Sequence, residues 1–389
     1  MVHQQVAGGT PRLRRVLILA GEASGDAHGA RVAREIRRRW PGVEMAGMGG
    51  GGMAGAGVRL LAGLDELAVM GFAEVLGRLP YFRRLERRLV RLLREETPDL
   101  VIPIDYPGLN MRITAHAARL RIPVLYYIGP QVWAWRAGRA ERLSRLANRI
   151  AVILPFEAPL YRAHRGRARF VGHPLLDEEV RPDPESLARD LGIEPGRPVL
   201  ALFPGSRQQE LRRHAGPFTA TARELRRRVP DLAVIVSKVP SLAESEYRSL
   251  PFPTTEDAHS LRALATAGLV KSGTGTLEAA LAEMPFAVAY ITHPATFFLA
   301  RRLVRVPHVA LANLVAGDRV VPEFIQGEMS PPVVAGALEP LLDGSSAERR
   351  TMVAGLRGIR HALGSPGASA RVVDLVEELL RETAGGAPG

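Results

Sequence analysis

Carboxylate, hydroxyl and glycine residues follow the first apolar run of the sequence, at a point where they could bind a ligand. The run at residues 16–20 leads into Gly21-Glu22-Ala23-Ser24-Gly25-Asp26, and a helix is predicted from about Ala27 to Trp40. Open α/β sheets bind ligands at the carboxyl ends of their strands. The alternative is a capped helix start with Ser24 or Asp26 as the N-cap, and the two uses are compatible.

A second carboxylate occupies the same kind of position later in the chain. Asp105 comes directly after the apolar run at residues 100–104, and a helix is predicted from near Asn110. A carboxylate at this edge of a sheet can act as a general base. An Asx-turn or helix cap is the alternative, and from these residues alone it is the more common use.

The second half of the chain repeats the pattern with groups that suit a phosphate. Arg207 lies at a strand-to-helix turn, Pro204-Gly205-Ser206-Arg207, and a turn rich in glycine and hydroxyl groups opens a later helix. A helix N-terminus and a guanidinium both attract phosphate oxygens. The sequence therefore predicts a diphosphate pocket, although not a P-loop. Its residues are Arg207, Ser272, Gly273, Thr274, Gly275 and Thr276, with Glu278 either accepting ribose hydroxyls or favouring the helix N-terminus.

Two other patterns carry weaker signals. Residues 47–52 formally match the dinucleotide fingerprint, but they follow the second predicted strand, and glycines 55 and 57 disfavour a following helix. We expect a flexible loop over a cleft and no nicotinamide site. His28, His173, His293 and His308 lack metal-ligand spacing, and there is no Asp-x-Asp motif, so we expect neither a metal nor another cofactor.

Composition limits the classes of partner. The 52 Lys and Arg residues outnumber 40 Asp and Glu residues, giving a formal net charge of +12. Such a chain attracts nucleic acid, anionic lipid or a phosphorylated substrate. Only 5% of residues are aromatic and no recognition module is present, so we expect no nucleic-acid partner. No apolar run is long enough to span a membrane and the N-terminus does not follow the order of a secretory signal, so a cytoplasmic protein is expected.

The alternation of apolar runs with amphipathic segments predicts an α/β fold with parallel sheets. Two prolines and a cluster of acidic residues interrupt it at 175–190, where we place a linker. The predicted domains are residues 1–180, residues 190–345 and C-terminal helices at 346–389. The predicted strands are VLILA, VEMAG, LVIPI, PVLYYI and RIAVIL in the first domain, and VLALF, LAVIV, GLVKS and FAVAYI in the second.

The segment from Tyr81 to Glu95 is predicted to be a basic amphipathic helix, with leucines at helical spacing and six arginines between them. It suits a domain helix with a solvated face and a membrane-surface helix about equally. The preceding apolar stretch, residues 67–72, favours the membrane slightly.

Several strings, in their order and spacing, closely resemble the lipid-A-disaccharide synthase family, glycosyltransferase family 19. They are GEASGD at 21–26, YIGPQVWAWR at 127–136, LPFE at 154–157, FVGHPL at 170–175, PGSR at 204–207 and SGTGTLEAAL at 272–281. The resemblance continues around Asn313, Glu323 and Gln326. It covers the chain from Val16 to about Met329.

The resemblance implies an inverting, metal-independent glycosyltransferase of the B fold, with two Rossmann-like domains facing a cleft. In this fold the C-terminal helices often pack back on the first domain. The enzyme would work at the cytoplasmic face of the inner membrane, binding its anionic surface. It would join UDP-2,3-diacylglucosamine to 2,3-diacylglucosamine 1-phosphate (lipid X), forming the β-1,6-linked lipid A disaccharide 1-phosphate and UDP.

Residue by residue, the resemblance assigns the motif aspartate to Asp105, which we predict to be the general base. It also places substrate-binding residues at Glu22, Ser24, Asp26, Arg207, Asn313, Glu323 and Gln326. Gly108 departs from the family pattern, which commonly has a second acidic residue there, and the glycine run at 49–52 replaces a more ordinary loop. The alternatives are a UDP-sugar 2-epimerase, another B-fold glycosyltransferase and, on charge alone, a nucleic-acid-binding protein.

Overall fold

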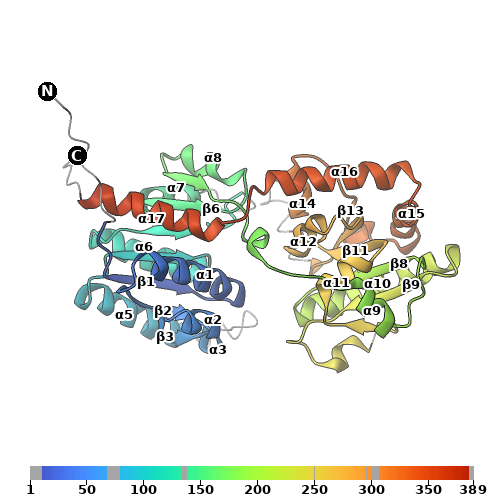
Figure 1. Ribbon diagram of the computed structural model, residues 1–389, viewed down its shortest axis with the longest axis horizontal. Helices are drawn as coiled ribbons and strands as arrows, with labels where there is room; N and C mark the ends of the chain where they lie inside the picture. Colours follow the sequence, from blue (N-terminus) through green and yellow to red (C-terminus); the bar gives the residue numbers. More distant parts are fainter. Residues whose placement is uncertain are drawn as a thin grey trace. The chain divides into compact units, whose positions relative to one another are not determined.

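The computed structural model describes residues 11–67, 79–133, 138–248, 250–294, 297–298 and 306–384. The chain forms two compact units (Figure 1). Unit 1 comprises Met1–Asp177 and Ser365–Gly389, and unit 2 comprises Glu178–Gly364. The first crossing between units falls within the segment at 175–190. The C-terminal helices are shared, because α16 (Ala347–Ala362) belongs to unit 2 and α17 (Ala368–Ala384) to unit 1.

Unit 1 is built on a parallel sheet with the order β3-β2-β1-β4-β5-β6-β7. The direction of strand succession reverses between β1 and β4, which is the point where open α/β sheets form a ligand crevice. The strands are β1 (Arg15–Ala20), β2 (Glu44–Gly49), β3 (Arg59–Gly63), β4 (Leu100–Ile104), β5 (Leu125–Tyr127), β6 (Arg149–Val152) and β7 (Ala168–Phe170).

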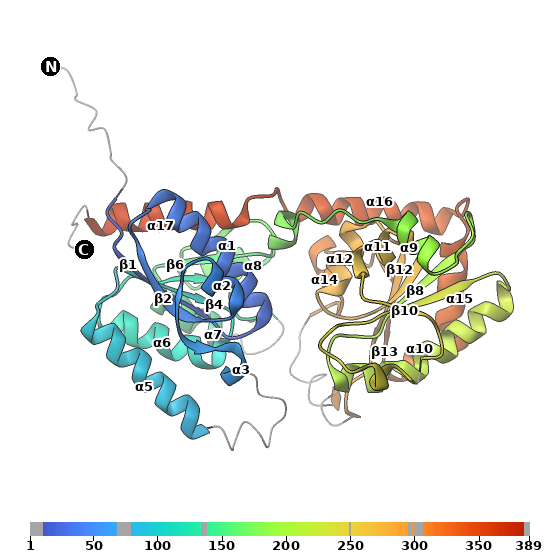
Figure 2. The ribbon, with the colours of Figure 1, turned by 60° about the horizontal axis from the view of Figure 1, so that its bottom comes forward.

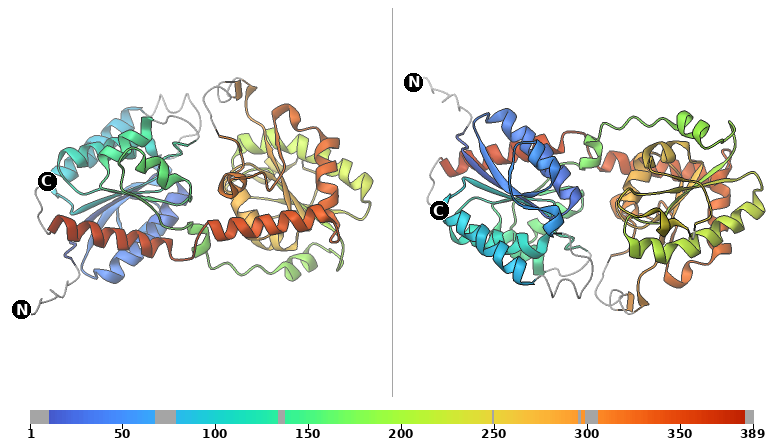
Figure 3. Two further views of the ribbon diagram at one scale, coloured as in Figure 1. Left: turned by 90° about the horizontal axis from the view of Figure 1, so that it is seen from above. Right: turned by 90° about the horizontal axis from the view of Figure 1, so that it is seen from below.

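Helices cover both faces of this sheet because its strands are apolar on both sides. Leu17 and Leu19 of β1 pack on one face, and Ile18 and Ala20 pack on the other. The first face is covered by α5 (Leu79–Glu95), α6 (Pro107–Arg119), α7 (Gly138–Leu146) and α8 (Glu157–Arg162). The second is covered by α1 (Ala23–Arg39), α2 (Gly51–Gly55) and α17, and Figure 3 shows the two groups on opposite sides. The described residues of unit 1 also form two shorter helices, α3 (Leu64–Leu67) and η1 (Pro174–Asp177).

Unit 2 is a second parallel sheet, with the order β10-β9-β8-β11-β12-β13 and the reversal between β8 and β11. Its strands are β8 (Val199–Phe203), β9 (Ala233–Ser237), β10 (Thr254–Thr255), β11 (Ala267–Lys271), β12 (Phe286–Tyr290) and β13 (Glu323–Ile325). Besides α16, the helices in the described part of this unit are α9 (Pro184–Asp190), α10 (Gln208–Arg228), η2 (Glu244–Tyr247), α11 (Ala258–Leu264), α12 (Gly275–Leu281), α14 (Leu311–Ala316), η3 (Gln326–Glu328) and α15 (Pro331–Leu342). Within the unit, α10 packs on α15, and α12 and α14 pack on α16. The prediction of an α/β fold with two Rossmann-like parallel sheets is confirmed.

The amphipathic helix predicted at 81–95 is α5, which lies beside α6 (Figure 2). Leu85, Leu89 and Leu93 are buried in the unit 1 core, while the arginines of the opposite face are exposed. The apolar stretch predicted to support a membrane contact lies outside the described residues from position 68 onward. None of the helices in the described ranges combines the length and apolar character needed to span a bilayer.

Candidate active site

The carboxyl ends of β1 and β4 bring Glu22 and Asp105 to the reversal point of the unit 1 sheet. Asp105 and Tyr106 both have left-handed backbones, with φ of 42° and 48°. This conformation is unfavourable for residues with a Cβ and persists only where the surroundings enforce it. The strand therefore ends in a strained turn that presents the Asp105 side chain.

Asn110 and Tyr126 enforce that turn. The Asn110 Nδ2 lies 3.1 Å from the carbonyl oxygens of Leu19 and Ile104 and 2.8 Å from that of Asp105. The Tyr126 hydroxyl donates to the same Asp105 carbonyl at 2.8 Å. The buried amide thus ties β1 to β4. The expected helix start near Asn110 is wrong, since α6 begins at Pro107 and its N-cap, Tyr106, makes no side-chain cap bond.

The Asp105 carboxyl sits in an environment that favours proton uptake. Burial, and then the negative charge of Glu22, raise its pKa to about 6, against a smaller opposing effect of the Tyr106 N–H. A carboxylate with this pKa is ionised at neutral pH and is a stronger base than an exposed aspartate. No metal-binding group of three or more His, Asp or Glu side chains exists among the described residues.

Glu22 and Ser24 remain open at this edge. Both are exposed, and Glu22 is the N-cap residue of α1 without a side-chain cap bond. The expectation of a helix starting near Ala27 with Ser24 or Asp26 as its cap is wrong, because α1 begins at Ala23. Its first turn is therefore uncapped by side chains.

Asp26 instead holds the glycine run after β2. Its Oδ1 accepts the N–H groups of Gly50 (2.7 Å) and Met53 (3.0 Å), and its Oδ2 accepts that of Gly52 (3.0 Å). A Cβ at Gly52 would lie 2.7 Å from that Oδ2. The expected flexible loop is thus wrong. Glycine is required because the backbone wraps the buried Asp26 carboxylate, and the segment forms the short helix α2.

In unit 2, β8 and β11 are neighbours at the reversal point, and each leads into a helix N-terminus. Arg207 is the N-cap residue of α10 and is exposed, and its guanidinium makes no hydrogen bond or ion pair with the described residues. Glu210 supports this turn, because it accepts the Ser206 N–H at 3.1 Å and pairs with Lys271 at 2.7 Å. A free guanidinium beside two helix N-termini is suited to an anion.

The turn before α12 presents its backbone and the exposed residue Thr274, whereas the hydroxyls of Ser272 and Thr276 bond within the protein. The Ser272 hydroxyl donates to the Val309 carbonyl (2.9 Å) and that of Thr276 to the Gly273 carbonyl (2.8 Å), and both residues are buried. Gly273 has φ of 148°, which a side chain would disfavour. Because the first N–H groups of a helix have no intrahelical acceptor, the groups of the turn through Thr274 and Gly275 suit a phosphate.

Glu278 has a partner within the protein. Its carboxylate pairs with the guanidinium of Arg262, which lies 4.9 Å from the Phe203 ring centroid. The pair ties α12 to α11 under the end of β8. The predicted ribose contact of Glu278 stays a prediction, and any such contact would have to share the carboxylate with Arg262.

Asn313 and Glu323 are buried and bonded to each other. The Glu323 oxygens accept the N–H groups of Val309 and Ala310 at 2.9 Å and the Asn313 Nδ2 at 2.8 Å. Asn313 also exchanges two bonds with the backbone of Val321. They brace the start of α14 against β13. Their predicted substrate contacts remain untested.

Gln326 joins the segments that follow the carboxyl ends of β12 and β13. Its amide accepts from the Thr292 N–H at 2.7 Å and donates to the Thr292 carbonyl at 3.1 Å. The residue has φ of 52°, so the turn after β13 is also strained.

The sequence did not identify four residues that support the carboxyl edges of the two sheets: Glu157, Asn110, Glu210 and Lys271. Glu157 belongs to the LPFE string, and its signal was its place three residues after the end of a predicted strand. Asn110 gave no signal beyond a helical context. Glu210 and Lys271 lie next to recognised turns, so spacing alone pointed to their neighbourhood.

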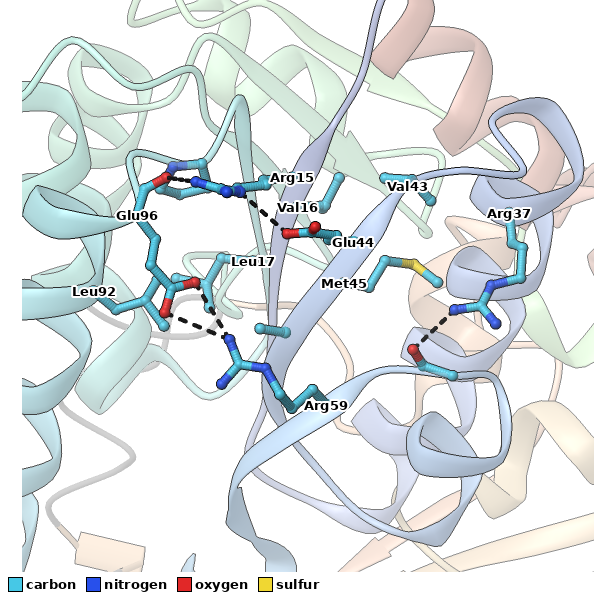
Figure 4. A pocket seen from close by; sticks show the side chains of 13 residues that line it. Arg15, Val16, Leu17, Arg37, Val43, Glu44, Met45, Arg59, Leu92 and Glu96 are labelled. Atoms are coloured by element: carbon cyan, nitrogen blue, oxygen red, sulfur yellow. Dashed lines mark hydrogen bonds and ion pairs between the residues drawn. The ribbon is translucent and has the colours of Figure 1, made fainter.

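A concave pocket lies elsewhere, at the amino ends of β1 and β2. It has a volume of about 250 Å³ and is lined by Arg15, Arg37, Glu44, Arg59 and Glu96 among others (Figure 4). Its charged side chains are engaged: Arg15 with Glu44, Arg59 with Glu96, and Arg37 with a backbone carbonyl. Because ligands of such sheets bind at the carboxyl ends, we do not assign the chemistry to this pocket.

Comparison with known proteins identifies close sequence relatives. A family profile described as lipid-A-disaccharide synthetase matches residues 16–365. The lipid-A-disaccharide synthase of Anaeromyxobacter dehalogenans (strain 2CP-C) is 39% identical over 381 residues, covering 96% of this chain and 99% of the relative. That of Geobacter sulfurreducens is 40% identical over 376 residues, covering 94% and 97%.

Solved structures share the fold at low identity. The S. aureus MnaA–UDP co-structure has a TM-score of 0.65 at 11% identity, covering 95% of this chain and 97% of that one. The calicheamicin glycosyltransferase CalG4 has a TM-score of 0.60 at 19% identity, covering 96% and 100%. These likenesses place both units within the B-type glycosyltransferase architecture, which glycosyltransferases share with UDP-N-acetylglucosamine 2-epimerases.

Proposed function

Because this chain belongs to the lipid-A-disaccharide synthetase family, we propose that it joins UDP-2,3-diacylglucosamine to 2,3-diacylglucosamine 1-phosphate in lipid A biosynthesis. The acceptor 6-oxygen forms a bond to the donor anomeric carbon as the bond from that carbon to UDP breaks. The acceptor proton passes to a base, and the products are the β-1,6 disaccharide 1-phosphate and UDP. The match across residues 16–365 carries this conclusion.

Mass spectrometry of the products formed from the two acylated substrates tests the reaction. We expect one disaccharide 1-phosphate and one UDP for each donor consumed. Transfer to an unacylated sugar, or conversion of UDP-N-acetylglucosamine to its 2-epimer with no acceptor, would contradict the proposal and favour an enzyme that shares only the fold.

We assign acceptor activation to Asp105 in unit 1. Inversion by direct displacement requires a base for the 6-hydroxyl, and the half-buried Asp105 carboxylate at the sheet edge has a pKa raised to about 6. Asp105→Asn keeps the shape and removes the base, so we expect turnover to fall by about 10²–10⁴-fold. Unchanged UDP affinity and an unchanged circular dichroism spectrum are the controls, and near-normal turnover of the folded variant would exclude this role.

We assign the donor diphosphate to unit 2. The exposed Arg207 guanidinium and the first N–H groups of α12 offer positive charge without a metal. Arg207→Ala should weaken UDP binding by about 10- to 100-fold in calorimetry. Arg226→Ala is the matched control, since Arg226 lies at the other end of α10, roughly 28 Å away along the helix axis. Equal affinities for both variants would rule out the assignment.

We further propose that the protein binds the anionic cytoplasmic surface of the inner membrane through the arginines of α5. The leucines of this helix are buried in the core, so only its charged face is free for the membrane, and acyl chains must bind elsewhere. Neutralising Arg83, Arg84, Arg87 and Arg91 should remove on the order of 1 kcal/mol per arginine from binding to anionic vesicles.

Flotation with anionic and with neutral liposomes measures this binding. The control neutralises four arginines at the end of α10, which changes the net charge equally: 223, 226, 227 and 228. If both variants lose binding equally, net charge alone explains the association and α5 has no special part.

A further inference from the structure

Glu157 is a buried carboxyl group that the reaction described above does not use. It is 3% exposed and is the first residue of α8, just beyond the carboxyl end of β6. Its Oε1 accepts the Trp133 indole N–H at 3.3 Å, and its Oε2 accepts the Leu154 N–H at 3.0 Å. Both oxygens are therefore directed at specific donors within unit 1.

The residues of α8 fasten the loop that follows β5. The Trp133 ring meets the Phe156 ring edge-on, with centroids 5.6 Å apart and an interplanar angle of 87°. The Tyr161 hydroxyl donates to the Pro130 carbonyl at 3.1 Å. Gly129 lies against the same phenol, because a Cβ there would be 2.3 Å from the Tyr161 oxygen. The loop from 129 to 133 is thus held at several points by one short helix.

The same loop leaves β5 next to the groups that hold Asp105. The Asp105 N–H donates to the Tyr127 carbonyl at 3.1 Å, and the Tyr126 hydroxyl donates to the Asp105 carbonyl at 2.8 Å. Ile128, the next residue, has a left-handed backbone with φ of 59°. A displacement of the loop would therefore pull on the two tyrosines that set the position of Asp105.

We propose that Glu157 is a positioning residue for acceptor activation, which it serves by holding the Trp133 indole and, through it, the loop beside Asp105. This role rests on the proposed function. It assigns no contact between Glu157 and substrate. Arrangement of reacting groups to within about 1 Å affects turnover by up to roughly 10²-fold, so a clamp of this kind has a measurable effect.

Electrostatic interactions support a link between the carboxyl groups of Glu157 and Asp105. Burial raises the pKa of Glu157 to about 7, hydrogen bonds from Leu154, Trp133 and Ile153 oppose this, and the negative charge of Asp105 adds to it. Ionised Asp105 therefore discourages ionisation of Glu157. The other titratable groups that face this pair are Glu22 before α1, Tyr106 beside Asp105, Tyr126 of β5, Arg139 of α7 and Tyr161 of α8.

A glutamine cannot replace Glu157 without loss. Its single oxygen can accept from Trp133 or from Leu154, but its NH₂ group would then face the other N–H donor. One of the two buried bonds must break. Glu157→Gln is thus a small change in shape that releases one end of the clamp.

Steady-state kinetics give the first test. We expect Glu157→Gln to lower kcat by about 10- to 100-fold while the donor KM and the UDP affinity stay unchanged, because the donor groups belong to unit 2. Glu141→Gln is the matched control, since Glu141 pairs with Arg145 at the surface of α7. Trp133→Phe should lower kcat in the same way and should add little to Glu157→Gln. If Glu157→Gln does not fold, the kcat of Trp133→Phe tests whether the bond between Glu157 and Trp133 affects turnover.

Indole resonances of ¹⁵N-tryptophan-labelled protein give the second test, which does not depend on activity. The Trp133 signal, assigned by Trp133→Phe, should titrate near pH 7 in the wild type. In Asp105→Asn its midpoint should move to lower pH, because removing the neighbouring negative charge lowers the pKa of Glu157.

The outcomes separate two claims. The proposed positioning role would be excluded if the Trp133 signal changed neither with pH nor in Glu157→Gln. It would also be excluded if Glu157→Gln and Trp133→Phe both folded and had normal kcat. Wild-type protein that forms no disaccharide would overturn the proposed function itself, whereas the indole titration would still show whether Glu157 holds Trp133.

Discussion

Gly51 and Gly52 form a matched pair for testing what Asp26 does. A Cβ at Gly52 would lie 2.7 Å from the Asp26 Oδ2, whereas a Cβ at Gly51 meets no atom within 4 Å. Asp26 cannot move aside without loosening its bonds to Gly50 and Met53. Gly52→Ala should break one or two charge-assisted bonds and lower the free energy of unfolding by about 2–4 kcal/mol. Gly51→Ala should raise it by about 0.5 kcal/mol, because it restricts the unfolded chain.

Tryptophan fluorescence in urea measures this effect in one unit. Trp40, Trp133 and Trp135 all belong to unit 1, so their emission follows the unfolding of that unit alone. At temperatures where both variants are folded, their acceptor KM should match the wild type. Equal midpoints for the two variants would refute the reasoning. A raised acceptor KM in Gly52→Ala without loss of stability would instead place Asp26 in the substrate site.

Three further outcomes concern titratable side chains. Because Glu22 raises the pKa of Asp105, Glu22→Gln should move the acid limb of kcat/KM, expected near pH 6, to lower pH; an unmoved limb would contradict the coupling. Burial lowers the pKa of His173 to about 4, so its contribution to stability is present above pH 6.5 and is lost as pH falls toward 4. The free energy of unfolding lost in His173→Gln should therefore be about 2 kcal/mol smaller at pH 5 than at pH 7.5, and a pH-independent loss would count against this. Glu323→Ala leaves three donors unpaired and should cost more than about 3 kcal/mol, seen as faster amide exchange around residue 310; unchanged exchange would contradict it.

The interior strands could be predicted from the sequence and the edge strands could not. Each predicted strand corresponds to an interior strand of one of the sheets, from β1 to β12. The strands β3, β7, β10 and β13 were not predicted, and each is an edge. Interior parallel strands are covered on both faces and form continuous apolar runs. Edge strands are short or partly exposed, as in Ala168–Phe170 and Thr254–Thr255, so hydrophobic patterning gives little signal.

The positions of the site residues could be predicted better than their roles. The strand-end rule located Glu22, Asp105 and Arg207 at the carboxyl edges, and the structure places them there. The same rule cannot tell whether a side chain faces solvent or a nearby backbone. That distinction depends on contacts between segments far apart in sequence, such as the bond between Asp26 and Gly50, whose positions differ by 24. Spacing within a motif contains no such information.

At the carboxyl edges of the two sheets, some charged side chains already have all their hydrogen-bond partners within the protein, and others can still bind a substrate. Asp26 in unit 1 and Glu323 in unit 2 each accept three N–H bonds and are almost fully buried. A carboxylate saturated in this way stabilises the loop around it, and a substrate could bind it only by displacing those donors. The side chains of Glu22 and Arg207 are exposed and have no such partners within the described parts of the chain. The groups that can still form bonds at each edge are therefore the ones to which chemistry should be assigned, and sequence motifs alone do not distinguish them from their supports.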